Sequence, residues 1–287
     1  MAHQLSTKWI KVSEPYPHVY HVELSRSPIN AFSEEFWKEY GRVFQRLSEE
    51  GSDVRVVALS SALPNVFTAG LDLKSATVGI LGPDSNSSDP ARSAVALRRS
   101  LIDFQDAISA PDRCPFPVIS ACHGHTIGLG VDIIAACDIR YAATNTTFSI
   151  REVALGLAPD IGTLAFLPKV TGNQSLLREL TYTARDFGVV EAEKLGLLSK
   201  VVQGGRDEVV AAALDLAKEI ASKSPVAVSS SKHLISHSRD NTVHDNLRYT
   251  AIWNSSQLQT EDILENLRTS KTKISPSFKP LKAPAKL

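Results

Sequence analysis

The chain has 287 residues, enough for one large domain or two small ones, and its 43% hydrophobic and 22% charged content is typical of a globular protein. Its 31 basic residues balance 31 acidic ones, and it has no basic stripe, which argues against a nucleic-acid-binding protein. No apolar run approaches the 18 residues of a membrane-spanning helix. Three cysteines without metal-like spacing predict reduced thiols in the core of an intracellular protein: Cys114, Cys122 and Cys137.

The first two thirds of the chain alternate predicted strands with predicted helices. The strands are predicted at Val19–Leu24, Val54–Ser60, Val118–Cys122 and Ile139–Ala142. Helical periodicity predicts helices at Ser33–Glu50, Ala91–Ser109 and Ile127–Cys137. The polar stretch from Val78 to Pro90 predicts a loop. Strands that alternate with helices favour an α/β fold with a mainly parallel sheet.

After residue 200 the pattern becomes entirely helical. Helices are predicted at Arg206–Ser222, Pro225–His237, Val243–Gln257 and Glu261–Thr269. We expect a boundary near residue 204, at Gly204-Gly205, and an extended, exposed tail over residues 275–287. The helices carry more apolar residues than one amphipathic face needs, among them Leu247, Tyr249, Ile252 and Trp253.

Two glycine turns follow predicted strands. Ala69-Gly70-Leu71 follows the second strand, and Gly128-Leu129-Gly130 follows the third and opens a helix. Backbone N–H groups are free at such turns, and two turns that face one point would form an oxyanion hole for a thioester oxygen. Each turn alone is better explained as a plain connection between a strand and a helix, because Gly-x-Gly is very common.

Three acids lie among apolar and small residues: Asp132, Glu152 and Asp160. A carboxylate in such surroundings is costly unless it is paired or neutral, and the same cost produces a carboxyl group that exchanges protons near neutral pH. From spacing alone, a buried polar network that only fixes the fold is about as well supported as catalysis. His123 and His125 lack a third nearby ligand, so no metal site is predicted.

The motifs together resemble the crotonase (enoyl-CoA hydratase/isomerase) superfamily. The resemblance rests on Ala69 to Leu73, Gly124 to Asp132, Ala136 to Ala142, Phe148 to Glu152, Leu155 to Leu157 and Pro159 to Thr163. It implies a spiral of ββα turns with an acyl-CoA-binding catalytic core over residues 1–204. It also implies a C-terminal helical region, residues 205–274, that assembles a homotrimer or hexamer. The family's oxyanion donors map to the backbone N–H groups of Leu71 and Leu129, with Ala69, Gly70, Gly128 and Gly130 around the substrate.

Within the superfamily, the three acids indicate the subgroup. Hydratases carry Glu at the positions of Asp132 and Glu152 and Gly at that of Asp160, whereas this chain resembles the isomerases that convert 3,5-dienoyl-CoA to 2,4-dienoyl-CoA in unsaturated fatty acid β-oxidation. The resemblance implies Glu152 as the base at C2, Asp132 as the acid at C6 and Asp160 as a supporting acid. No metal or redox cofactor is expected, because CoA is part of the substrate and only protons move. The alternatives are an enoyl-CoA hydratase and a non-catalytic crotonase-fold assembly protein.

The ends of the chain suggest a location. Ala285-Lys286-Leu287 resembles a peroxisomal import signal of the Ser-Lys-Leu type, which predicts the import receptor as a partner. The polar stretch from Met1 to Lys11 lacks the apolar core of a signal peptide. We therefore expect a peroxisomal protein, with the mitochondrion as the alternative. The sequence does not give the preferred acyl chain length, nor does it separate a trimer from a hexamer.

Overall fold

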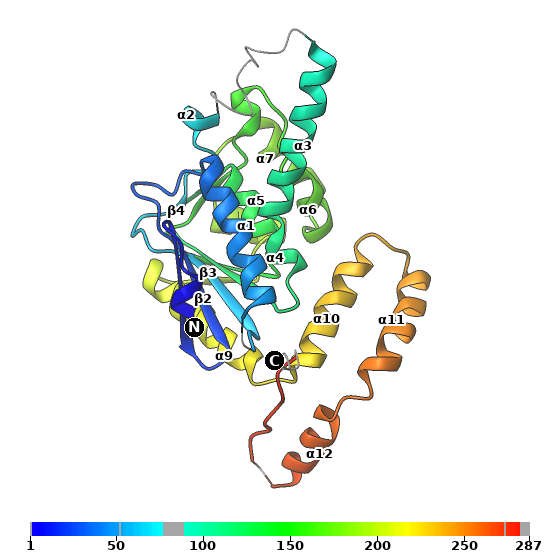
Figure 1. Cartoon of the computed structure of the whole chain (residues 1–287). Coiled ribbons are helices and arrows are strands. Elements are labelled where there is room, and N and C mark those ends of the chain that lie inside the picture. Colours follow the sequence, from blue (N-terminus) through cyan, green and yellow to red (C-terminus); the bar gives the residue numbers. More distant parts are fainter. Residues whose placement is uncertain (1, 52, 77–88, 273, 282–287) are drawn as a thin grey trace.

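The protein is built around two sheets (Figure 1). Its structure is a computed structural model that describes residues 2–51, 53–76, 89–272 and 274–281. The larger sheet has six strands in the order β1-β2-β3-β5-β7-β10: β1 (Ile10–Tyr16), β2 (Val19–Leu24), β3 (Val56–Ser61), β5 (Val118–Cys122), β7 (Ile139–Ala143) and β10 (Lys200–Val202). The smaller has the order β4-β6-β8-β9: β4 (Val66–Thr68), β6 (His125–Ile127), β8 (Thr147–Ser149) and β9 (Phe187–Gly188). Only the outer pairs β1/β2 and β8/β9 are antiparallel among the described pairings.

The chain winds as a spiral because each central strand of the large sheet leads into a short strand of the small one. β3 leads into β4, β5 into β6 and β7 into β8. Within each sheet these successive strands pair in parallel, so that each turn of the spiral stacks on the one before. The predicted α/β fold with a mainly parallel sheet is therefore confirmed.

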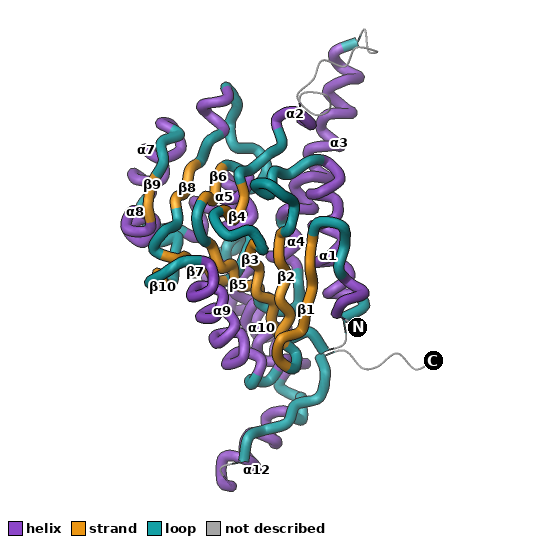
Figure 2. Tube along the Cα trace, turned by 90° about the vertical axis from the view of Figure 1, so that its left-hand side faces the viewer, coloured by secondary structure: helices purple, strands orange, loops and turns teal. Residues whose placement is uncertain are grey.

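Helices cover both faces of the six-stranded sheet (Figure 2). Alternate residues of one strand point to opposite faces: Val57 packs in the cluster that contains Tyr40 of α1 (Glu34–Glu49), and Val56 in the one that contains Ala213 of α9 (Arg206–Ala221). The remaining elements of the core are α2 (Leu73–Ala76), α3 (Pro90–Ile108), α4 (Ala110–Arg113), α5 (Leu129–Ala135), α6 (Thr163–Val170), α7 (Gln174–Thr183), α8 (Val189–Leu195) and the 3₁₀ helices η1 (Ala2–Leu5) and η2 (Glu152–Leu155).

The predicted strands and helices are all present, and β2 and β5 have the predicted bounds. Sequence reasoning missed β1 and the short strands, because segments of two or three residues show no periodicity and β1 is mostly exposed beyond Val12. The loop prediction was wrong at Pro90, which begins α3 behind an Asp89 cap. Residues 78–88 of that loop lie outside the described part of the chain. All three cysteines are free and buried, as predicted.

The C-terminal helices α10 (Pro225–Ser238), α11 (Val243–Gln257) and α12 (Asp262–Thr272) follow α9, which lies against the sheet (Figure 1). Lys232 joins α10 to the core by hydrogen bonds, whereas α11 and α12 extend away from it. Val209, Ala213 and Ala217 of α9 are buried against the sheet. Because α9 is a layer of the core, we propose that the C-terminal helical region begins between α9 and α10 rather than at residue 204.

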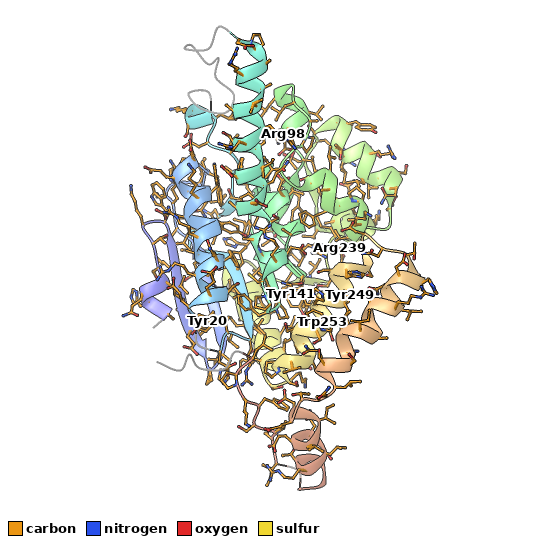
Figure 3. The ribbon with its side chains drawn as sticks, turned by 45° about the vertical axis from the view of Figure 1, so that its right-hand side comes forward. Tyr20, Arg98, Tyr141, Arg239, Tyr249 and Trp253 are labelled. Atoms are coloured by element: carbon orange, nitrogen blue, oxygen red, sulfur yellow. The ribbon has the colours of Figure 1, made fainter. Side chains whose placement is uncertain are left out.

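The contacts of this region bear on one expectation, which concerns the tail. Tyr249 and Trp253 of α11 (Figure 3) stack on His237 and His233 of α10, with ring centroids 4.0 and 3.9 Å apart. The tail was expected to be exposed, but Phe278 is buried, and its carbonyl oxygen accepts a hydrogen bond of 2.9 Å from Arg55. The Pro- and Lys-rich composition of the tail gave no sign that Phe278 would be buried beside Arg55.

Candidate active site

A cavity of about 150 Å³ lies where the ends of β4 and β6 meet α3 and η2. Its walls are largely apolar and include Leu101 and Phe104 from α3. The carboxyl groups of Asp132, Glu152 and Asp160 all line it. The fold thus brings together three acids that the sequence places on separate segments.

The two glycine turns meet at this cavity. Gly70 and Gly128 have φ angles of +90° and +53°, a region that residues with a side chain rarely adopt. A Cβ atom at Gly70 would lie 2.8 Å from the carbonyl oxygen of Ile127 and 3.4 Å from the nitrogen of Leu129, so the turns are in direct contact. The hydrogen bonds of the described residues include none donated by the N–H of Leu71 or Leu129. Two unused donors therefore stand side by side at the cavity wall.

Asp132 is the most enclosed of the three acids. It lies on α5, is 2% exposed, and its Oδ1 accepts a hydrogen bond of 2.6 Å from the N–H of Thr163, the first residue of α6. Burial raises the pKa of Asp132 to about 6, and the charge of Asp160 adds to this effect. Asp132 is therefore a carboxyl group that gains and loses a proton close to neutral pH.

Glu152 begins η2 and faces the second glycine turn. A Cβ atom at Gly128 would lie 3.2 Å from Glu152 Oε1, while Oε2 is buried without a hydrogen-bond partner among the described residues. Burial raises the pKa of Glu152 to about 7, with Asp132 as the next cause. A buried carboxyl oxygen without a partner is unfavourable in an empty site, and is typical of an atom that exchanges a proton with a ligand.

Asp160 lies at the mouth of the cavity, in the segment between η2 and α6. Asp160 is an exposed residue, but its carboxyl group is partly buried, and this partial burial raises the pKa of that group. Gln105 of α3 donates a hydrogen bond of 2.6 Å from Nε2 to the carbonyl oxygen of Asp160. Sequence reasoning missed Gln105, because a glutamine on a helix surface carries no signal of its own.

The structure separates the other predicted residues into those that line the cavity and those that do not. Ala69, Gly70 and Gly128 line it with Leu71 and Leu129. Gly130 does not; a Cβ atom there would lie 2.8 Å from Thr68 Cγ2, so this glycine allows α5 to pack closely on β4. Leu101 and Phe104 lie in the predicted helix Ala91–Ser109, and the sequence held no sign that this helix also borders a cavity.

No metal site is found in the part of the chain that the structure describes: no three His, Cys, Asp or Glu side chains there gather in a suitable arrangement. His123 Nε2 lies 2.7 Å from the carbonyl oxygen of Leu63, and His125 is exposed. Among the described helices, none is both long and apolar enough to cross a membrane.

Carboxyl groups of raised pKa beside two backbone N–H groups that have no acceptor among the described residues are an arrangement that can stabilise an enolate of a carbonyl substrate. The spiral fold also belongs to a known family. The model of the Enoyl-CoA hydratase/isomerase family matches residues 14–280, and the chain belongs to that family. The resemblance predicted from the motifs is confirmed.

Individual members of known name are similar to this chain over most of its length. The mouse protein named Delta(3,5)-Delta(2,4)-dienoyl-CoA isomerase, mitochondrial, is 44% identical over 92% of this chain and 80% of its own length. The Arabidopsis thaliana protein named Delta(3,5)-Delta(2,4)-dienoyl-CoA isomerase, peroxisomal, is 40% identical over 91% of this chain and 92% of its own. Among solved structures, the enoyl-CoA hydratase from Bacillus anthracis has a TM-score of 0.83 at 29% identity, covering 95% of this chain and 100% of that one.

Proposed function

We propose that the protein is an isomerase that converts 3,5-dienoyl-CoA to 2,4-dienoyl-CoA. The observation that carries the proposal is the cavity with two buried carboxyl groups of raised pKa, a third acid at its mouth and two unused backbone N–H groups. The relatives described above, which bear this activity in their names, support it.

The reaction begins with the thioester oxygen at the N–H groups of Leu71 and Leu129. Glu152 removes a proton from C2, and the electron pair of that C–H bond spreads along the conjugated chain to the thioester oxygen. The two N–H groups stabilise the negative charge on that oxygen. Asp132 then donates a proton to C6, the electron pair returns, and double bonds remain at C2 and C4. One proton leaves the substrate and one enters, so no electrons are gained or lost.

The carboxyl pair is suited to this exchange because its members titrate close together. Burial raises the pKa of Asp132 to about 6 and that of Glu152 to about 7. The charge of Asp132 opposes ionisation of Glu152, so the pair passes through a state that holds one proton. The reaction uses the form of this state in which Asp132 holds the proton and Glu152 is charged. The higher pKa of Glu152 favours the opposite form, but the two pKa values differ by only about one, so the form that reacts stays accessible. Asp160 supports it, since its charge further raises the pKa of both groups.

Purified protein is expected to convert 3,5-octadienoyl-CoA to the 2,4-isomer in buffer with a metal chelator and no added cofactor. The change in absorbance on isomerisation measures the rate, and crotonyl-CoA in a parallel reaction measures hydration. A double Asp132→Asn, Glu152→Gln variant is the matched control for non-enzymatic isomerisation. Fast hydration of crotonyl-CoA with no isomerisation of the dienoyl substrate would identify the protein as a hydratase instead.

We also propose that the projecting helices assemble a homotrimer or hexamer. Leu247 and Ile252 of α11 are 63% and 71% exposed, and Leu264 and Leu267 of α12 are exposed as well. Apolar surface of this kind is typical of an interface. The double variant Leu247→Ser, Ile252→Ser is expected to lower the molar mass measured by light scattering at micromolar concentration. A wild-type protein that is monomeric in the same measurement contradicts the proposal.

A peroxisomal location remains our proposal, supported by the resemblance of Ala285-Lys286-Leu287 to an import signal and by the Arabidopsis relative, whose name places that protein in the peroxisome. The mouse relative is named as mitochondrial. The three residues lie outside the described part of the chain. A fluorescent protein that ends in these residues should enter peroxisomes through the import receptor, and a diffuse signal would overturn the proposal.

A further inference from the structure

The segment that carries Asp160 has few hydrogen bonds to the rest of the protein, although Ile161 packs against the core. It runs from η2 to α6 and starts at Gly156, whose added Cβ atom would meet nothing within 4 Å. Ala158 and Asp160 are exposed, whereas Pro159 is buried. Among the hydrogen bonds of the described residues, only the one from Gln105 joins residues 158–161 to another element. This acid is therefore held less firmly than Asp132, which lies within a buried helix.

Gln105, in contrast, sits on a firmly packed part of α3. Its neighbour Phe104 is buried and stacks on Trp37 of α1, with ring centroids 4.8 Å apart. Two residues further on, Ala107 packs so closely on α1 that a Cβ atom at Gly41 would lie 2.9 Å from it. A hydrogen bond from such a helix restrains its acceptor, because the backbone that carries the donor side chain has little freedom to move.

We propose that Gln105 is a positioning residue that holds Asp160 in place beside Glu152 and Asp132. The inference deepens the proposed function and rests on it. Gln105 touches the backbone of Asp160, not the substrate, so its effect must pass through the Asp160 carboxyl group. Loss of the bond lets that carboxyl group drift along the mouth of the cavity, and a displacement of about 1 Å is enough to slow an enzyme considerably.

The test replaces Gln105 with methionine, which keeps the length of the side chain and removes the donor. Loss of this neutral hydrogen bond should lower kcat about fivefold. KM should stay within about twofold, since Gln105 does not bind the acyl-CoA. Gln105→Asn, which keeps the amide but is too short, should lose as much. Gln45→Met is the matched control, because Gln45 lies on the exposed face of α1 and bonds only Glu49 among its recorded partners.

A double-mutant cycle with Asp160→Asn separates positioning from a general structural role. If Gln105 acts through the Asp160 carboxyl group, Gln105→Met should cost little once that group is gone. An equal loss of kcat in both backgrounds, or wild-type kcat for Gln105→Met, overturns the inference. The wild-type rate with 3,5-octadienoyl-CoA is measured first, so an inactive wild type counts against the proposed function alone. In that case, hydrogen exchange followed by mass spectrometry still tests whether Gln105 holds the segment. The backbone amides of residues 156–161 must exchange faster in Gln105→Met than in wild type, and must not do so in Gln45→Met.

Discussion

Glu152→Gln is expected to abolish exchange of the C2 proton of the substrate, whereas Asp132→Asn is expected to permit that exchange and stop the reaction before C6 is protonated. The first variant lacks the base, and the second lacks the acid. Each should reduce the rate of isomerisation by roughly 10²- to 10⁴-fold, the usual contribution of a general acid or base. Incorporation of deuterium at C2 from D₂O, followed by mass spectrometry, distinguishes the two steps. The reverse pattern would exchange the two roles, and near wild-type turnover in either variant would remove that residue from the mechanism.

Stability provides the control for Asp132→Asn. The asparagine keeps an oxygen that accepts the hydrogen bond from the N–H of Thr163. Asp132 has a pKa of about 6 in the folded protein, above its ordinary value of 3.8, so the folded state holds the proton more tightly than the unfolded chain. With aspartate at position 132, the free energy of unfolding of the protein falls as pH rises from about 4 to about 6. Above that range the whole of this loss remains. Asp132→Asn should melt at a higher temperature than wild type at about pH 8, and this difference should shrink toward about pH 4.

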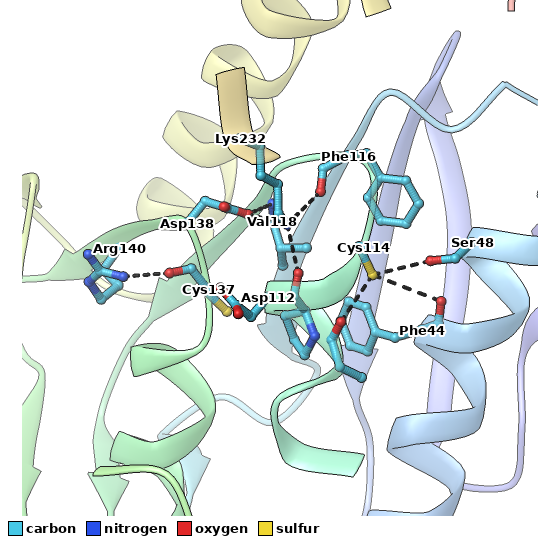
Figure 4. A network of polar contacts seen from close by, with 12 residues as sticks. Phe44, Ser48, Asp112, Cys114, Phe116, Val118, Cys137, Asp138, Arg140 and Lys232 are labelled. Carbon is cyan, nitrogen blue, oxygen red and sulfur yellow. Dashed lines mark hydrogen bonds and ion pairs between the residues drawn. The ribbon is translucent and has the colours of Figure 1, made fainter. Parts of the chain in front are cut away.

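Lys232→Met is expected to lower the free energy of unfolding by about 3 kcal/mol, the lower end of the range for breaking a buried ion pair. The buried Lys232 Nζ on α10 donates to three acceptors in the core: the carbonyl oxygens of Pro111 and Phe116, at 2.7 and 2.9 Å, and Asp138 Oδ2, at 2.8 Å (Figure 4). Methionine fills the space but leaves the Asp138 carboxylate and two carbonyl groups without this donor. Urea denaturation measures the loss, with Lys223→Met at an exposed position next to α10 as the control.

The loss in Lys232→Met should depend on pH. Burial raises the pKa of Asp138, and Lys232 opposes that rise. Without the lysine, the pKa of Asp138 in the folded protein rises further above its value in the unfolded chain. The buried charge of Asp138 therefore lowers the free energy of unfolding more as pH rises, and this loss is relieved when the carboxyl group takes up a proton at lower pH. The difference in stability from wild type should be smaller at about pH 5 than at about pH 8. A pH-independent loss would mean that packing, rather than the unpaired charge, is responsible.

The sequence located most of the candidate site because its chemistry is local. A glycine with positive φ, such as Gly70 or Gly128, marks a turn wherever it stands. An acid surrounded by apolar residues, such as Asp132, indicates a shifted pKa before any fold is known. The family resemblance then gave these residues their expected roles. The helices with strong periodicity were found for the same reason, since their apolar stripes are repeated over several turns.

The sequence by itself determined the α/β pattern, the two turns and the three acids, since each of these depends on residues close together in the chain. Only the tertiary structure decided that the turns touch, that Glu152 Oε2 has no hydrogen-bond partner among the described residues, and that α9 belongs to the core. It alone also revealed the bonds from Gln105 to Asp160 and from Lys232 to Asp138. The reason is physical: a hydrogen bond or a contact depends on distances that the winding of the whole chain sets, and residues 55 or 94 positions apart carry no local sign of each other.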